Sequence, residues 1–231
     1  VQAIQQNGDP DIFSKQYGRD WEKACAAAHE DFRRWGFNTA GYGSPEPLRR
    51  MMPCMVPSYL TKNANYLSDQ EFFYSDIFDP NVQEKMKDQL RDLVRTNKDN
   101  PNLIGYYWTD TPQWDLERAR RKRGTDWVSM IRELPASAPG KKRYERFLAE
   151  GGASDEDFLR LIARELYKVI GEETRRLHPD ALIFGERYLM NDHPNCVLEE
   201  ALPYIDVLSI QPGGAEFNGA FFDRLHKDRK S

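Results

Sequence analysis

Hydrophobic residues recur at intervals of three and four in three long stretches of the chain, which predicts three amphipathic helices. The first covers about 20–36, with Asp20 as a candidate N-cap. The second begins at about residue 80, where an aspartate is followed by a proline that suits the first helical position. The third follows Ser154 and continues to about residue 177. A shorter helix is expected near 197–201.

Short apolar runs lie between these helices, and each has the length of a buried strand. We expect five strands, near 37–43, 51–57, 103–108, 181–185 and 205–210. A strand, loop and helix that repeat in this way predict an α/β fold with a parallel sheet and right-handed crossovers. Since a closed (β/α)8 barrel needs eight strands, the sequence predicts an incomplete barrel. The competing architecture is an open doubly wound sheet, which no GxGxxG or GxxxxGK loop supports.

Residues 115–152 interrupt the alternation of strands and helices. We interpret the chain as one domain, 1–231, with a large insertion at about 115–152. The insertion contains a basic run, 118–123, which in most proteins is a solvated helix face. A less common role for such a run is a rim that binds the sulfate or carboxylate groups of an anionic polysaccharide.

The composition excludes several classes of function. The chain is 39% hydrophobic and 30% charged, and its net charge of -4 argues against nucleic acid as a partner. No apolar run approaches the roughly 20 residues of a membrane span. Three widely spaced cysteines and four scattered histidines predict neither a disulfide framework nor a metal or other cofactor. The chain starts at Val1 without an initiator methionine, so we expect a partial chain whose location its start does not reveal.

The aromatic strand 103–108 leads into the sequence Thr-Asp-Thr-Pro, where proline ends strand pairing. Asp110 therefore lies where a buried strand opens into a loop, which is where parallel α/β folds place their chemistry. The neighbouring rings of Trp108 and Trp114 would desolvate this aspartate and raise its pKa toward that of a general acid. The plainer interpretation is that Asp110 caps the turn that follows it.

Glu186 is the second candidate for a catalytic carboxylate, because it follows the strand 181–185 directly. Arg187 is adjacent to Glu186, so a structural ion pair between the two is an equally good interpretation. Glu216, in the last loop, is a weaker candidate, since most loop glutamates are solvated. One hypothesis is that Asp110 and Glu186 act together at the same edge of the sheet.

Further side chains near the strand ends are expected to contact a sugar, amides through its hydroxyls and rings through its C–H faces. This set is Asn38, Tyr42, Tyr107, Trp108, Trp114, Arg187, Tyr188, His193 and Gln211. The plainer interpretations are a turn at Asn38 and core packing for the rings. Trp21 and Trp35 fall on the apolar stripe of the first helix, and we predict that they belong to the core.

Four short segments carry a family resemblance, and each lies near an expected strand end or helix start. They are Trp35-Gly36-Phe37-Asn38-Thr39-Ala40-Gly41, Asp76-Ile77-Phe78-Asp79-Pro80, Leu103-Ile104-Gly105-Tyr106-Tyr107 and Asp206-Val207-Leu208-Ser209-Ile210-Gln211. Over residues 17–212 the chain resembles clan A glycoside hydrolases, most closely the agarase-like family 50 and more distantly family 42. The resemblance implies a (β/α)8 barrel that cleaves β-linked galactan-type polysaccharide with retention. It also suggests a secreted or periplasmic protein.

The chain departs from this family at the acid/base position. The fourth strand of the family ends in Asn-Glu, and the resemblance places Asp110 and Thr111 at those two positions. Threonine cannot protonate a glycosidic oxygen, and the second carboxylate of such enzymes would lie beyond the strands present here. The sequence therefore predicts a hydrolase-like protein that uses Asp110, or a non-catalytic carbohydrate-binding relative.

Overall fold

A computed structural model describes residues 12–41, 43–58, 60, 75–110, 113–189, 193–211 and 218–228. For residues 12, 109, 110, 189, 225 and 228 it describes the backbone alone. Tyr42, Thr111 and Glu216 lie outside the described residues.

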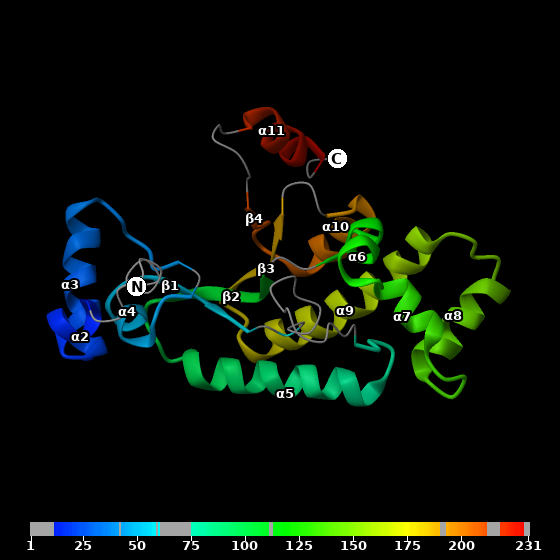
Figure 1. Ribbon diagram of the computed structural model, residues 1–231, viewed down its shortest axis with the longest axis horizontal. Coiled ribbons are helices and arrows are strands. Elements are labelled where there is room, and N and C mark those ends of the chain that lie inside the picture. The colour runs from blue at the N-terminus through cyan, green and yellow to red at the C-terminus, as the bar shows by residue number, and fades with distance from the viewer. Residues whose placement is uncertain are drawn as a thin grey trace.

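Four parallel strands form one sheet whose spatial order follows the chain (Figure 1). They are β1 (Cys54–Pro57), β2 (Leu103–Asp110), β3 (Leu182–Leu189) and β4 (Ile210–Gln211). The expected parallel sheet is confirmed. Strands that neighbour one another in chain order are typical of a barrel, whereas a doubly wound sheet reverses its strand order at a switch point.

Three of the five expected strands are shorter than the apolar runs suggested, and the run 51–57 contributes only Cys54–Pro57. The run 37–43 contributes an isolated parallel bridge between Ala40 and Cys54, and the run 205–210 contributes only Ile210 to β4. In the last of these runs the Asp206 carboxylate accepts the backbone N–H of Ile183, at 2.8 Å. The Asp206 side chain thus takes the place of a backbone carbonyl as the partner of Ile183, and the segment 205–209 is not a regular strand.

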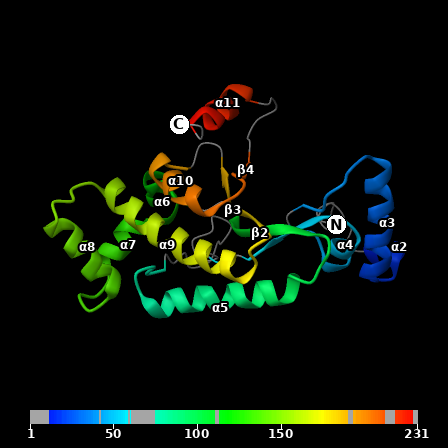
Figure 2. The ribbon, with the colours of Figure 1, turned by 180° about the vertical axis from the view of Figure 1, so that it is seen from behind.

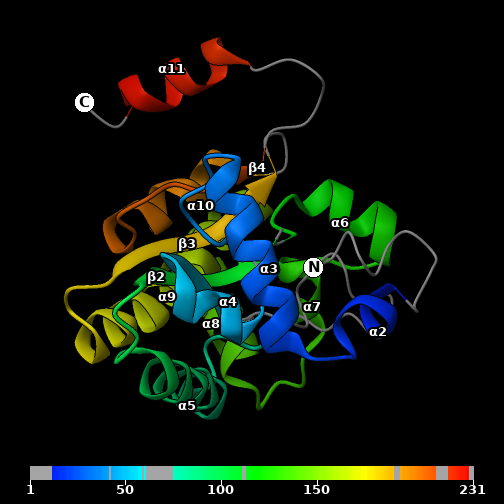
Figure 3. The ribbon, with the colours of Figure 1, turned by 90° about the vertical axis from the view of Figure 1, so that its left-hand side faces the viewer.

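The predicted helices are confirmed, with bounds α3 (Trp21–Arg34), α5 (Pro80–Asn97), α9 (Asp155–Leu177) and α10 (Asn195–Ala201). The side chains of Asp20, Asp79 and Ser154 cap the first three of these by accepting backbone N–H groups. Helix α9 packs against both α5 and α10, and with the sheet these helices cover the main core (Figures 2 and 3). The hydrophobic pattern did not predict α2 (Ile12–Tyr17), α4 (Glu46–Met51), the 3-10 turn η2 (Leu202–Tyr204) or α11 (Gly219–Asp228).

Two tryptophans that the helical pattern assigned to the core are exposed. Trp21 retains 39% of its accessible surface and Trp35 retains 59%. Helix α3 buries Ala24 and Cys25, and Cys25 belongs to a small core cluster with residues of α4 and β1. Trp21 and Trp35 lie outside this contact and are exposed, so the prediction that they are core residues is wrong.

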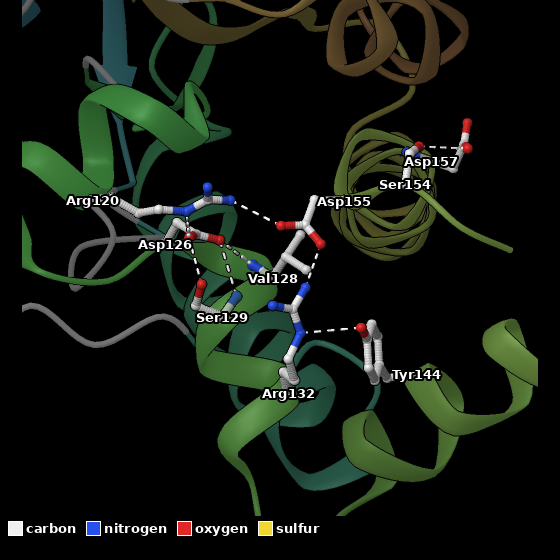
Figure 4. Close-up of polar contacts among 9 residues, drawn as sticks. All are labelled: Arg120, Asp126, Val128, Ser129, Arg132, Tyr144, Ser154, Asp155 and Asp157. Carbon is white, nitrogen blue, oxygen red and sulfur yellow. Dashed lines mark hydrogen bonds and ion pairs between the residues drawn. The ribbon is translucent and has the colours of Figure 1, made fainter.

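The insertion consists of three helices, α6 (Leu116–Arg123), α7 (Trp127–Glu133) and α8 (Pro139–Ala149). Buried Asp126 caps α7 by accepting the N–H groups of Val128 and Ser129, and it also receives Arg120 from α6 (Figure 4). Asp155, in the first turn of α9, pairs with Arg120 and with an arginine of α7. These contacts fasten the insertion to the start of α9.

A glycine shifts the alternation of side chains along β3. Ile183 belongs to the core beneath the helices, whereas Phe184 stacks on Tyr107 with ring centroids 5.0 Å apart. Regular alternation would place Glu186 on the same face as Phe184. Gly185 adopts a left-handed φ of 63°, and the pairing register with β2 shifts at this point. As a result Glu186 points to the face covered by α9.

Candidate functional site

The carboxyl edge of the sheet brings together several of the residues selected from the sequence. Asp110 is the last residue of β2 and pairs in register with Arg187 of β3. Gln211 ends β4, pairs with the residue two positions after Arg187, and is exposed. In parallel α/β folds this edge is the common place for ligands.

Asn38 lies at the opposite edge of the sheet. It is exposed and accepts a 2.9 Å hydrogen bond from the Thr39 hydroxyl, as a turn-forming asparagine does. The neighbouring bridge joins Ala40 to Cys54, which itself pairs with Leu103 at the start of β2. The length of β2, seven steps of roughly 3.3 Å or about 23 Å, separates that level from the end of the strand.

A pocket of about 310 Å³ opens between the segments that follow β2 and β3. Its lining residues are Asp115, Leu116, Glu156, Leu159, His193 and Pro194. His193 is half-buried, and its ring lies 6.1 Å from that of Tyr188 and 5.9 Å from that of Phe221 in α11. A lining of apolar side chains, carboxylates and an imidazole suits a sugar ring, whose C–H face is apolar and whose hydroxyls donate.

The two acidic residues in this pocket were not selected from the sequence. Asp115 is the N-cap of α6, where its side chain accepts the N–H of Arg118 at 2.7 Å, and Glu156 lies in the first turn of α9. Both positions favour acidic residues for reasons of helix stability alone. Their convergence depends on how the insertion packs against the start of α9.

Glu186 is fully buried in an aromatic cage. Its Oε2 accepts the indole N–H of Trp114 at 2.7 Å and the hydroxyl of Tyr167, which in turn contacts the hydroxyl of Tyr188 at 2.7 Å. Burial, and then the neighbouring carboxylate, raise the pKa of Tyr167 and of Tyr188. Both phenols therefore remain protonated and able to donate.

Sequence reasoning missed Tyr167, because it lies within the apolar stripe of α9 and looks there like an ordinary core ring.

The other predicted aromatic contacts are packed inside the molecule. Trp108 and Trp114 are fully buried, and Trp108 donates its indole N–H to the hydroxyl of Thr174 at 3.0 Å. Tyr107 is 8% exposed and receives a 3.3 Å hydrogen bond from the hydroxyl of Ser209. These rings fix the strands, and in this structure their faces contact other side chains.

The basic run of the insertion forms most of α6. Arg120 binds Asp126 and Asp155, and Arg121 pairs with Glu117 one turn before it. These pairs favour the interpretation of a structural and solvated face for the two arginines.

Among the residues that the structure describes, no cluster of three or more histidine, cysteine, aspartate or glutamate side chains could hold a metal ion. None of the helices in the same part of the chain is long and apolar enough to cross a membrane.

No protein-family model matches the sequence, and no curated protein matches it by sequence. Three solved structures share its fold. The crystal structure of an agarase, AgWH50C, has a TM-score of 0.67 at 16% identity and covers 94% of this chain and 35% of its own. PfGH50B has a TM-score of 0.72 at 13% identity, and the match covers 93% of this chain and 37% of PfGH50B. An exo-beta-agarase has a TM-score of 0.73 at 14% identity, and the match covers 97% of this chain and 35% of the agarase.

The chain spans about a third of the length of the solved structures it matches. At such low identity the likeness shows the fold. The resemblance to agarases noted from the sequence is therefore confirmed for the architecture of the chain, and these neighbours are glycoside hydrolases.

Proposed function

We propose that this chain forms part of a (β/α)8 barrel of a glycoside hydrolase that acts on β-linked, galactan-type polysaccharide. The observation that carries the proposal is the fold shared with three agarase-type structures over 93% to 97% of the chain. The sequential order of four parallel strands supports a barrel, since it has no switch point. Strands β1 and β4 would then continue into further βα units.

Asp110 is the proposed general acid. It ends β2 at the carboxyl edge of the sheet, five residues before Asp115, which lines the pocket. The partner carboxylate would come from a strand outside this sheet. Its distance from Asp110 would set the stereochemistry, at about 5–5.5 Å for retention and about 6.5–9.5 Å for inversion.

The remaining roles are substrate contacts. Arg187, His193 and Gln211 belong to the same edge and offer hydrogen bonds to sugar hydroxyls. The pocket below His193 has the volume of a binding site for a small sugar unit. Asn38, at the opposite edge, is not included in this proposal.

A second candidate function is a carbohydrate-binding protein without catalysis. The threonine at position 111 favours it, because the related hydrolases have their acid/base glutamate there. In that case the pocket would still bind sugar, and Asp110 would serve as a hydrogen-bond acceptor.

Hydrolysis of a panel of β-galactans, agarose and porphyran included, tests the proposal. The full-length protein that contains this chain is compared with its Asp110→Asn variant. Asp99→Asn is the matched control, because Asp99 is exposed in the turn before the other end of β2. We expect Asp110→Asn to lower kcat by about a hundredfold or more with unchanged binding. Full activity in this variant would refute the role of Asp110, and binding without hydrolysis in the parent would favour the second function.

A further inference from the structure

We propose that Glu186 is a positioning residue whose buried carboxylate fixes Trp114 and, through it, the start of α6, a few residues after Asp110. The sequence singled out Glu186 as a second catalytic carboxylate, and its surroundings point to this different role. The inference about Trp114 stands on geometry alone. Its consequence for catalysis rests on the proposed function of Asp110.

The buried Glu186 carboxylate needs hydrogen-bond donors around it. Glu186 has no accessible surface, and a carboxylate in that position is unfavourable unless donors surround it. Trp114 and Tyr167 supply two donors to a single oxygen, Oε2. They come from different parts of the chain, the segment after β2 and the helix α9. The carboxylate therefore joins β3, α9 and the start of the insertion at one point.

The hydrogen bond from Trp114 to Glu186 fixes the orientation of the indole ring. The Trp114 ring is fully buried and stacks on Trp127 of α7, with centroids 5.0 Å apart and planes at 10°. Stacking fixes the plane of the indole, and the bond to Glu186 fixes its rotation within that plane. The next residue, Asp115, caps α6. The segment after β2 is thus held at 114 and 115, only four residues beyond Asp110.

The negative charge of the Glu186 carboxylate strengthens both of these hydrogen bonds. Hydrogen bonds to a carboxylate are roughly twice as strong as those between neutral groups. Glutamine at position 186 would keep the shape and one acceptor oxygen, but it would lose this charge assistance for both donors at once. Loss of an anchor can cost far more in rate than in binding, since a displacement of about 1 Å can lower a rate by about a hundredfold.

The experiment uses the full protein and its Glu186→Gln variant. The indole N–H signals of the tryptophans are followed by ¹⁵N NMR, and Trp114→Phe assigns the relevant signal. Glu165→Gln is the matched control, because Glu165 lies on α9 and accepts the amide of Gln83 at 2.9 Å, away from the cage. We expect Glu186→Gln to move the Trp114 signal and to raise its hydrogen exchange about tenfold, as the charge-assisted bond is lost. The control should change neither.

A kinetic comparison then tests the effect on Asp110. In an active parent we expect Glu186→Gln to lower kcat by about tenfold or more while KM changes little. Trp114→Phe removes the donor and keeps a ring, so it should cause a similar loss. The double variant should lose no more than either single one. This second variant also keeps the test decisive if Glu186→Gln fails to fold.

Each outcome decides one part of the proposal. An unchanged Trp114 signal in a folded Glu186→Gln protein overturns it. A changed signal with unchanged kcat overturns the link to Asp110 and leaves a structural anchor. A parent that is inactive on every polysaccharide refutes the proposed function, and the NMR comparison still decides whether Glu186 fixes Trp114.

Discussion

The carboxylate of Asp126 joins α6 to α7 within the insertion, and its removal should weaken this contact measurably. Asp126 is fully buried and accepts the backbone N–H of Val128 at 2.8 Å and that of Ser129 at 3.0 Å. The hydroxyl of Ser129 donates at 2.6 Å and the guanidinium of Arg120 donates as well (Figure 4). Burial alone would raise the pKa of Asp126, but these donors outweigh it and lower the pKa.

The loss of unfolding free energy expected for Asp126→Ala follows from these contacts. Loss of an N-cap costs about 1 kcal/mol. The remaining bonds to the charge add about 2 kcal/mol, a figure kept low because the Arg120 side chain is 45% exposed. Asp126→Ala should therefore lower the free energy of unfolding by about 3 kcal/mol, or the Tm by about 6–12 °C. Asp126→Asn keeps an acceptor for the cap and should cost about half as much.

Urea unfolding followed by tryptophan fluorescence measures these differences, and the stacked ring of Trp127 lies next to the substituted residue. Asp155→Asn is the control. Its carboxylate is 34% exposed and binds Arg120 and Arg132, so it should cost less than about 1 kcal/mol. An Asp126→Ala protein within about 0.5 kcal/mol of the parent would refute the reasoning.

Three further predictions concern other parts of the fold. Gly105→Ala should unfold or strongly destabilise the chain, because a Cβ there would lie 2.0 Å from the carbonyl oxygen of Leu182; normal thermal unfolding would contradict this. Trp35→Gln should lower the free energy of unfolding by less than about 1 kcal/mol, because Trp35 is exposed. Trp127→Ala should lower it by about 3–5 kcal/mol in the same urea assay, because Trp127 is buried. Hydrogen bonding by an α9 arginine lowers the pKa of Glu173, so its stabilisation is complete above the ordinary pKa of about 4.3 and is lost as pH falls below that value. Glu173→Gln should remove this part of the acid dependence of Tm, and an unchanged pH profile would rule it out.

The long helices could be predicted from the sequence because two independent signals agree at each of them. The apolar stripe gives the period, and capping residues such as Asp20 and Ser154 give the start. The insertion helices were harder to predict, since their shortness leaves little room for a period. The exposure of Trp35 was missed because a stripe shows which side of a helix is apolar, but not how far the contact extends.

The candidate site was only partly predictable for a related reason. The position of Asp110 at a strand end follows from local sequence, and β2 does end there. The environment of Glu186 depends on Tyr167, 19 residues away in a different element, and no local pattern pairs them. The pocket beside His193 likewise arises from residues of α6, α9 and the segment after β3, which are far apart in the sequence.

The left-handed conformation at Gly185 determines which of two charged side chains is buried. Any side chain at this position would meet a methyl carbon of Ile205 at 2.7 Å, in addition to the strain of a positive φ. If the strand relaxed to regular geometry, alternation would turn Arg187 toward α9 and Glu186 toward the open face. The φ angle of Gly185 thus determines whether Glu186 or the adjacent Arg187 faces α9. A substitution at this glycine would exchange the two charges without changing either residue.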